Sequence, residues 1–188
     1  MTQRRVPPPH DENPELGELI VSEDELRERI SQLGKQITAD YAGRPPLLVG
    51  VLKGAFVFMS DLARSIDLPV EFDFMAVSSY GSATKTSGVV RIVKDLDLDL
   101  TDRRVILVED IVDSGLTLNY LLKNLRGRGP ASLDVCALVL KEGAQKVEPD
   151  LRYVGFRIPD EFVVGYGLDV AESYRNLAAI HAYDADLA

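Results

Sequence analysis

The chain has 188 residues, of which 46% are hydrophobic and 27% charged, and its formal net charge is −9 at pH 7. This length and composition predict one globular domain with a sizeable core. An acidic surface repels phosphate backbones and anionic lipids, which argues against a general nucleic-acid or membrane-surface binder. A small anionic ligand is not excluded, because local charge decides its binding.

The single cysteine, Cys136, lies in an apolar run and is predicted to be a small buried side chain. One cysteine cannot form an internal disulfide, so we expect no dependence on an oxidising compartment. No apolar run reaches the ~18 residues that a membrane span needs, and the first residues lack the apolar segment of a signal peptide. These features predict a cytoplasmic protein without a membrane partner.

The first half of the chain predicts a tail followed by alternating helices and strands. Residues 1–15 are rich in proline and charge, which predicts a disordered tail before a single domain at 16–188. A capping box of Ser22 and Glu25 predicts a helix that extends to about Tyr41. Next we expect a buried strand, an amphipathic helix and a strand with one wetter face, at 47–52, 55–66 and 70–79.

The second half continues the alternation after a small, polar loop at 80–88. We expect a strand pattern at 89–100, a buried strand at 104–109, a helix carrying leucines 118, 121, 122 and 125, and strands at 133–140, 151–156 and 162–166. Strands that alternate with helices predict an α/β fold with a mostly parallel central sheet flanked by helices. Such sheets bind ligands beyond the carboxyl ends of their strands.

The stretch VILVEDIVDSGLTL (105–118) places three carboxylates where a buried strand ends. Its glycine-containing turn at a helix N-terminus would present free N–H groups to a phosphate, with hydroxyl donors beside them. Carboxylates instead accept hydrogens from sugar hydroxyls or bind Mg²⁺. The segment is therefore predicted to hold a phosphorylated sugar. The alternative, that Asp113 or Ser114 only caps the helix, explains one residue but not three carboxylates.

These residues resemble the phosphoribosyl diphosphate (PRPP) signature of the type I phosphoribosyltransferases, and the Glu-Asp pair with a later aspartate is similar to the hypoxanthine-guanine branch. Further motifs in the family order extend the resemblance over about residues 18–183. LKG (52–54) resembles the pyrophosphate loop, SSYGSATKTSG (78–88) the lid, and LVLKEG with IPDEFVVGYGLDVAESYRNL the purine-binding end. The resemblance implies a small hood formed by N- and C-terminal segments.

The resemblance also implies which residues bind the donor. Those that would bind PRPP are Lys53, Gly54, Glu109, Asp110, Ser114, Gly115, Thr117 and Arg175. The implied cofactor is Mg²⁺, which would be held by Glu109, Asp110 and Asp169. The Leu52–Lys53 peptide bond is cis in many relatives. Taken singly, Lys53 and Arg175 would also fit as plain surface charges.

On the purine side, the resemblance implies that Lys141 donates to the 6-oxo group, Phe162 stacks on the ring and Val163 reads its edge through the backbone. Asp169 would bind beside the purine as well. Asp113 would face N7 and take its proton, as the catalytic base. Ser79 and Tyr80 would belong to a lid that excludes water. Singly, Phe162 and Val163 would also fit as core residues, Lys141 as a solvated strand end and Asp169 as a loop acid.

The implied reaction is transfer of the 5-phosphoribosyl group from PRPP to hypoxanthine or guanine, giving IMP or GMP and diphosphate. A relative that prefers xanthine would use the same donor site. A PRPP-sensing regulator is a further alternative, but it should carry a nucleic-acid patch or an added DNA-binding domain. The 46 residues before the first predicted strand hold one capped helix and no basic cluster. The family is usually dimeric or tetrameric, so we expect a homodimer or homotetramer.

The run DLDLDLT (95–101) resembles two unrelated motifs. Asp97 to Thr101 matches the D-x-D-x-T pattern of haloacid-dehalogenase-like phosphatases, but no core strand directly precedes it. A calcium loop would need glycine at Leu100 and an acid at Ile106. The Leu/Asp alternation instead predicts an edge strand with one wet face.

Overall fold

The structure is a computed structural model that describes residues 15–79 and 90–184. Tyr80 and, apart from Glu15, the predicted tail at 1–15 lie outside the described residues. The elements are β1 (Leu16–Val21), α1 (Glu23–Asp40), β2 (Leu47–Leu52), α2 (Ala55–Ser65), β3 (Glu71–Ser79), β4 (Val90–Lys94), β5 (Arg104–Val112), α3 (Leu116–Arg126), β6 (Ser132–Lys141), β7 (Tyr153–Ile158), β8 (Val163–Val164) and β9 (Ile180–Tyr183). In this part of the chain, no helix is long and apolar enough to cross a membrane.

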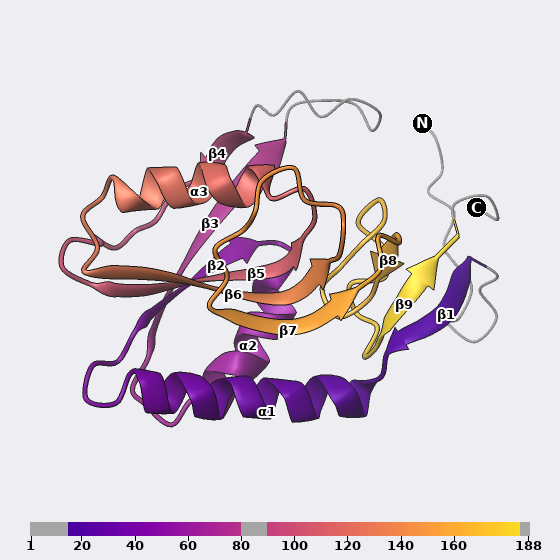
Figure 1. Ribbon diagram of the computed structural model, residues 1–188, viewed down its shortest axis with the longest axis horizontal. Helices are drawn as coiled ribbons and strands as arrows, with labels where there is room; N and C mark the ends of the chain where they lie inside the picture. The colour runs from indigo at the N-terminus through magenta and orange to yellow at the C-terminus, as the bar shows by residue number, and fades with distance from the viewer. Residues whose placement is uncertain (1–14, 80–89, 185–188) are drawn as a thin grey trace.

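The central sheet has the strand order β4-β3-β2-β5-β6-β7, and only β4 runs antiparallel to its neighbour. The predicted α/β fold with a mostly parallel sheet is therefore confirmed. A second, antiparallel sheet in the order β1-β9-β8 joins the two ends of the described chain. This is the expected hood, and it lies beyond the carboxyl ends of β6 and β7 (Figure 1).

Helices α1 and α2 cover one face of the central sheet and α3 covers the other (Figure 1). Each face carries a hydrophobic core. Along β2, Leu48 faces the core formed with α1 and α2, whereas Leu47 and Val49 face the core formed with the leucines of α3. A strand that is buried on both faces reads as a continuous apolar run, as in LLVGVL. Cys136 is fully buried in the first core, as predicted, and burial raises the pKa of its thiol.

Helix α1 begins with the predicted capping box. The backbone N–H of Glu25 donates to Ser22 Oγ at 3.3 Å, and the backbone N–H of Ser22 donates to Glu25 Oε2 at 2.9 Å. From this helix, Arg29 donates to the backbone carbonyls of Val154 and Gly155 on β7, at 2.7 and 3.0 Å. These bonds satisfy backbone groups along the edge of the sheet at β7.

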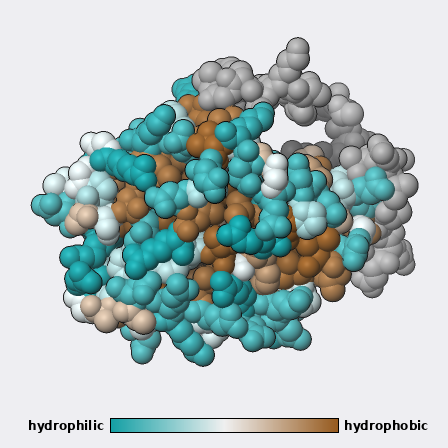
Figure 2. Space-filling model, in the orientation of Figure 1, coloured by the Kyte–Doolittle hydropathy of each residue, from teal (hydrophilic) through white to brown (hydrophobic). Residues whose placement is uncertain are grey.

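Hydrophobic residues are also visible on the surface of the molecule, between α1 and α3 in the view of Figure 2.

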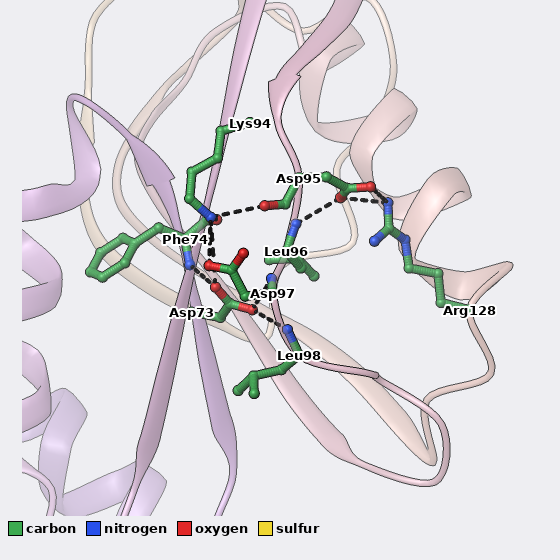
Figure 3. A network of polar contacts seen from close by, with 8 residues as sticks. All are labelled: Asp73, Phe74, Lys94, Asp95, Leu96, Asp97, Leu98 and Arg128. Carbon is green, nitrogen blue, oxygen red and sulfur yellow. Dashed lines mark hydrogen bonds and ion pairs between the residues drawn. The ribbon is translucent and has the colours of Figure 1, made fainter.

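The predicted edge strand at 95–101 is wrong, because β4 ends at Lys94 and the chain then runs without regular structure. Aspartate side chains accept the N–H groups that a strand would give to a neighbour. The buried carboxylate of Asp73 accepts from the N–H groups of Asp97 and Leu98 at 2.8 and 2.9 Å (Figure 3). Lys94 donates to Asp97 and to two backbone carbonyls beside it. The leucines of this run still face the core on the α3 side.

Strand β5 is three residues longer than predicted and ends at Val112. Ile111 and Val112 pair with Val139 and Leu140 of β6, so the ladder continues past the acidic pair. Glu109 and Asp110 are therefore held by a core strand and not by a loop. Strands β1 and β9 were not predicted individually, because short strands of a partly exposed sheet have no continuous apolar run.

Candidate active site

Two cavities open at the carboxyl ends of the parallel strands, where ligands bind in such folds. The larger one, of about 520 Å³, is lined by the predicted donor-site residues Lys53, Gly54, Glu109, Asp110, Ser114, Gly115, Thr117 and Arg175. The smaller one, of about 200 Å³, is lined by Lys141, Phe162 and Val163. Asp110, Asp113 and Asp169 line both cavities. Fourteen of the predicted site residues are thus described, and apart from Ser79 they all gather around these two spaces.

The turn between β5 and α3 has the geometry of an anion site. Gly115 is the N-cap of α3 with φ +76°, and no side chain caps the helix. A Cβ atom at this position would lie 2.5 Å from the carbonyl oxygen of Val147, so the turn requires glycine. The carbonyl of Ser114 accepts from the N–H groups of Lys146 and Val147, at 2.9 and 3.3 Å. Lys146 and Val147 thereby fix the carbonyl side of the turn. On its other side, the N–H of Leu116 at the start of α3 makes only a long bond, of 3.5 Å, to Ser114 Oγ.

Glu109 and Asp110 are carboxylates placed where charge is costly. Glu109 is only 6% exposed, and burial together with the charge of Asp110 raises its pKa well above the usual value. Burial also raises the pKa of Asp110 to about 6, although the N–H of Ile111 and the charge of Arg175 oppose the shift. The positive charge nearby is too small to keep both carboxylates of this pair ionised at their usual pKa values. Hydroxyl donors or a cation would stabilise it.

The donor set fits Mg²⁺ that arrives with a phosphate ligand. Carboxylate oxygens suit this ion, which is usually held by one or two carboxylates plus substrate phosphates rather than by an all-protein cage. Within residues 15–79 and 90–184, no group of three or more His, Cys, Asp or Glu side chains could hold a metal by itself. The buried pair Glu109 and Asp110 supplies the two carboxylates that such a shared site needs.

The LKG segment (52–54) after β2 packs tightly against Asp110. The Leu52–Lys53 peptide bond is cis, as the resemblance implies. A Cβ atom on Gly54 would lie 1.5 Å from Asp110 Oδ2, and one on Gly167 would lie 2.2 Å from the carbonyl oxygen of Gly54. Only glycine at both positions lets β2, β5 and the segment after β8 meet so closely.

The segment 169–175 carries Asp169 and Arg175 and adds an acid that was not predicted. Arg175 Nη2 lies 2.8 Å from Asp169 Oδ1 and 3.4 Å from Glu172 Oε2. Glu172 Oε2 also lies 2.9 Å from Lys53 Nζ. Arg175 donates to the carbonyl of Gly167, yet its buried Nε has no hydrogen-bond partner among the described residues. In the sequence, only the position of Glu172 between Asp169 and Arg175 indicated that it could belong to the site.

The smaller cavity combines a buried cation with an exposed aromatic ring. Lys141 is only 9% exposed, and its Nζ lies 3.3 Å from Asp160 Oδ1 and 3.8 Å from Asp113 Oδ2. Phe162 is 53% exposed, and its ring lies 5.7 Å from that of Tyr183. Asp160 and Tyr183 were not predicted, since their roles depend on contacts between distant segments.

The predicted lid residues are only partly described. Ser79 is the last residue of β3 and pairs with Val90 of β4, at the edge of the central sheet. Tyr80 lies outside the described residues. The role of both residues stays a prediction.

Comparisons with known proteins agree with this geometry. Residues 22–171 match the family model of the phosphoribosyl transferase domain. A hypoxanthine-guanine phosphoribosyltransferase of Mycobacterium tuberculosis is 51% identical over 176 residues, which cover 90% of this chain and 87% of that protein. The protein of that name from Dictyostelium discoideum is 52% identical over 164 residues, covering 85% and 91%. A solved hypoxanthine phosphoribosyltransferase of Staphylococcus aureus superposes with a TM-score of 0.88 at 42% identity, covering 92% and 94%. The chain therefore belongs to the phosphoribosyltransferase family, in its hypoxanthine-guanine branch.

Proposed function

We propose that the protein is a purine salvage enzyme that transfers the 5-phosphoribosyl group from PRPP to hypoxanthine or guanine, giving IMP or GMP and diphosphate. The observation that carries this proposal is the pair of adjoining cavities. One presents phosphate and sugar-binding groups, the other presents a cation and an aromatic ring, and Asp110, Asp113 and Asp169 line both. A donor and a base bound in them would meet at these carboxylates.

In the larger cavity, the N–H groups at the start of α3 and the hydroxyls of Ser114 and Thr117 would hold the 5′-phosphate. Glu109 and Asp110 would accept hydrogens from the ribose hydroxyls. Lys53 and Arg175 would face the diphosphate and stabilise it as it leaves. Fixing both ends of the donor leaves the bond between sugar and diphosphate oriented for transfer.

When bound, Mg²⁺ would neutralise charge on the leaving diphosphate. Glu109, Asp110 and Asp169 are the residues that we propose to hold it. Both carboxylate oxygens of Asp169 already have partners, because Oδ1 pairs with Arg175 and Oδ2 accepts from the N–H of Glu172 at 2.8 Å. The pair from β5 is therefore the better-placed part of this set.

In the smaller cavity, Lys141 would donate to the 6-oxo group of the purine, Phe162 would stack on the ring and the backbone of Val163 would read its edge. The ammonium of Lys141 is kept in place by Asp160 on one side and Asp113 on the other. A cationic donor at this position favours a 6-oxopurine over adenine, whose 6-amino group is itself a donor. Asp113 would take the proton that the base loses.

A turnover assay with PRPP, Mg²⁺ and the four bases in parallel tests the proposal. We expect IMP from hypoxanthine and GMP from guanine, with little product from adenine. Preferred use of xanthine would instead support the xanthine-preferring alternative. If none of the four bases gave product, the protein would be better explained as a non-catalytic PRPP-binding regulator.

Two further parts of the proposal concern assembly and location. We propose a homodimer or homotetramer, which light scattering on the purified chain would test. We propose that it works in the cytoplasm, since its one cysteine is buried and gives no internal disulfide.

The division of the chain into a tail at 1–15 and one domain at 16–188 also stays a prediction. Limited proteolysis would test it.

A further inference from the structure

Glu172 occupies the space between the two cations that face the larger cavity. Its Oε2 atom lies 2.9 Å from Lys53 Nζ and 3.4 Å from Arg175 Nη2, and all three residues line that cavity. Lys53 comes from the loop after β2 and Glu172 from the segment after β8, 119 residues later. One carboxylate oxygen thus bridges two cations from separate parts of the fold.

The backbone holds Glu172 in this position. Ala171 and Glu172 have φ values of +48° and +69°, in the left-handed region that costs side-chain-bearing residues energy. The N–H of Glu172 donates to Asp169 Oδ2 at 2.8 Å, and Val170 and Ser173 exchange backbone hydrogen bonds. The conformation is therefore fixed by the segment itself and does not depend on the contact with Lys53.

The contact between Glu172 and Lys53 is weak enough for another anion to replace it. The side chain of Lys53 is 67% exposed and that of Glu172 is 49% exposed, so water screens their attraction. By contrast, Asp169 and Arg175 pair at 2.8 Å with side chains that are 27% and 25% exposed. The Asp169–Arg175 pair is the firmer contact, and the Lys53–Glu172 pair is the one that an incoming anion can replace.

From these contacts we infer that Glu172 is a displaceable stand-in for the diphosphate group, which competes with PRPP and with diphosphate for Lys53 and Arg175. The inference rests on the proposed function, because it assigns those two cations to the diphosphate. A diphosphate brings more charge and more acceptor oxygens than one carboxylate, so it wins the competition. When diphosphate leaves, the carboxylate returns and covers the cations again. Glu172 thereby weakens binding of the donor and aids release of the product.

The test is Glu172→Gln, which keeps the shape of the side chain and removes its charge. Calorimetric titration in Mg²⁺ would measure binding of PRPP, of diphosphate and of the nucleotide product to the wild-type chain and the variant. We expect PRPP and diphosphate to bind about two- to five-fold more tightly to the variant, the range that an exposed ion pair spans. The nucleotide, which has no diphosphate, should bind equally to both proteins.

Two companion variants sharpen the result. Glu18→Gln removes one negative charge from the exposed surface of β1 and should leave all three affinities unchanged. Glu172→Asp keeps the charge on a shorter side chain, and it should fall between wild type and Glu172→Gln. The gain in Glu172→Gln should also shrink as salt is raised, because screening weakens the bridge in the wild-type chain.

The inference is overturned if diphosphate and PRPP bind equally or more weakly to Glu172→Gln, or if the nucleotide gains affinity to the same degree. The latter result would mean that Glu172 acts through the shape of the whole segment. Failure of the proposed function looks different, since the wild-type chain would then bind no PRPP and convert no purine. If Glu172→Gln did not fold, binding of diphosphate no tighter to Glu172→Asp than to wild type would overturn the inference.

Discussion

Asp113 is the residue that we propose to stand between donor and base. It lines both cavities, its side chain is 59% exposed, and its Oδ2 atom lies 3.8 Å from Lys141 Nζ. It is also the first residue of the turn that would hold the 5′-phosphate, and it is not the N-cap of α3. A carboxylate in this place can reach the base without supporting the fold.

Replacing Asp113 should therefore separate chemistry from binding. We expect Asp113→Asn to lower kcat by about 10²- to 10⁴-fold, the usual contribution of a general base, while the KM for PRPP changes little. Steady-state kinetics would measure both constants. Asp150→Asn, in an exposed carboxylate outside both cavities, is the matched control and should behave as wild type. Equal turnover in Asp113→Asn would rule out the role as base.

Asp110, unlike Asp113, has a charge that affects the stability of the fold. Its pKa is raised to about 6 by burial, whereas an unfolded chain has the ordinary value near 3.8. The folded state therefore binds this proton more tightly, so the ionised carboxylate destabilises the fold as pH rises from about 4 to above 6. The penalty is absent at low pH, where the residue is protonated in both states.

Asp110→Asn should remove that penalty while abolishing turnover. Relative to wild type, we expect the free energy of unfolding of the variant to gain on the order of 1–3 kcal/mol between pH 4 and pH 7. Urea denaturation at both pH values would measure the gain. A difference that stays constant with pH would show that Asp110 is not a buried, destabilising charge.

At the scale of elements, the connection between β5 and α3 depends on one glycine. Gly115→Ala would place a methyl group 2.5 Å from the carbonyl of Val147, in a backbone conformation with φ +76°. We expect a loss of about 2–3 kcal/mol of stability and a rise of about ten-fold or more in the KM for PRPP. Thermal denaturation and steady-state kinetics would measure the two effects.

Gly129→Ala is the matched control for this change. Gly129 has nearly the same φ, +70°, but a Cβ atom there would meet nothing within 4 Å. It should cost only the backbone term, about 1 kcal/mol, and should leave the KM unchanged. Equal effects of the two substitutions on KM would contradict the view that the turn must approach Val147 closely to bind phosphate.

The elements also show what the sequence could predict. Periodic leucines and apolar runs predicted α3 and the buried strands because packing on two faces leaves a direct trace in the sequence. The Leu/Asp alternation at 95–101 misled, since it fits an edge strand as well as a segment whose aspartates bind N–H groups locally. Motif order predicted most residues around the cavities. Glu172 and Asp160 needed the structure, because their partners Lys53 and Lys141 lie in other elements.

At the scale of the whole molecule, the site exists only in the folded chain. Its walls come from all five strands β2 to β6, the start of α3 and the segment after β8, so residues from 51 to 175 must be brought together. A ligand that binds this assembled site and not the unfolded chain stabilises the fold. Binding and thermal stability should therefore be linked.

We expect PRPP with Mg²⁺, at about 100 times its dissociation constant, to stabilise the protein by ~2.7 kcal/mol. For a chain of this size that raises Tm by roughly 5–10 °C. Differential scanning fluorimetry would measure the shift, with Mg²⁺ alone as the control. An equal shift from Mg²⁺ alone would show that the metal binds without the donor, against the shared site proposed above.

The pairing of β1 with β9 has a consequence for how the chain is made. Leu16 pairs with Tyr183 and Leu19 with His181, and the phenolic hydroxyls of Tyr174 and Tyr183 both donate to Glu15. During synthesis β1 leaves the ribosome first, and its partner strand follows about 160 residues later. The central sheet can assemble in the meantime, but β1 must wait as an unpaired edge. We therefore expect the hood to close as the last long-range step of folding, and the segment that carries Arg175, between β8 and β9, to be fixed only then.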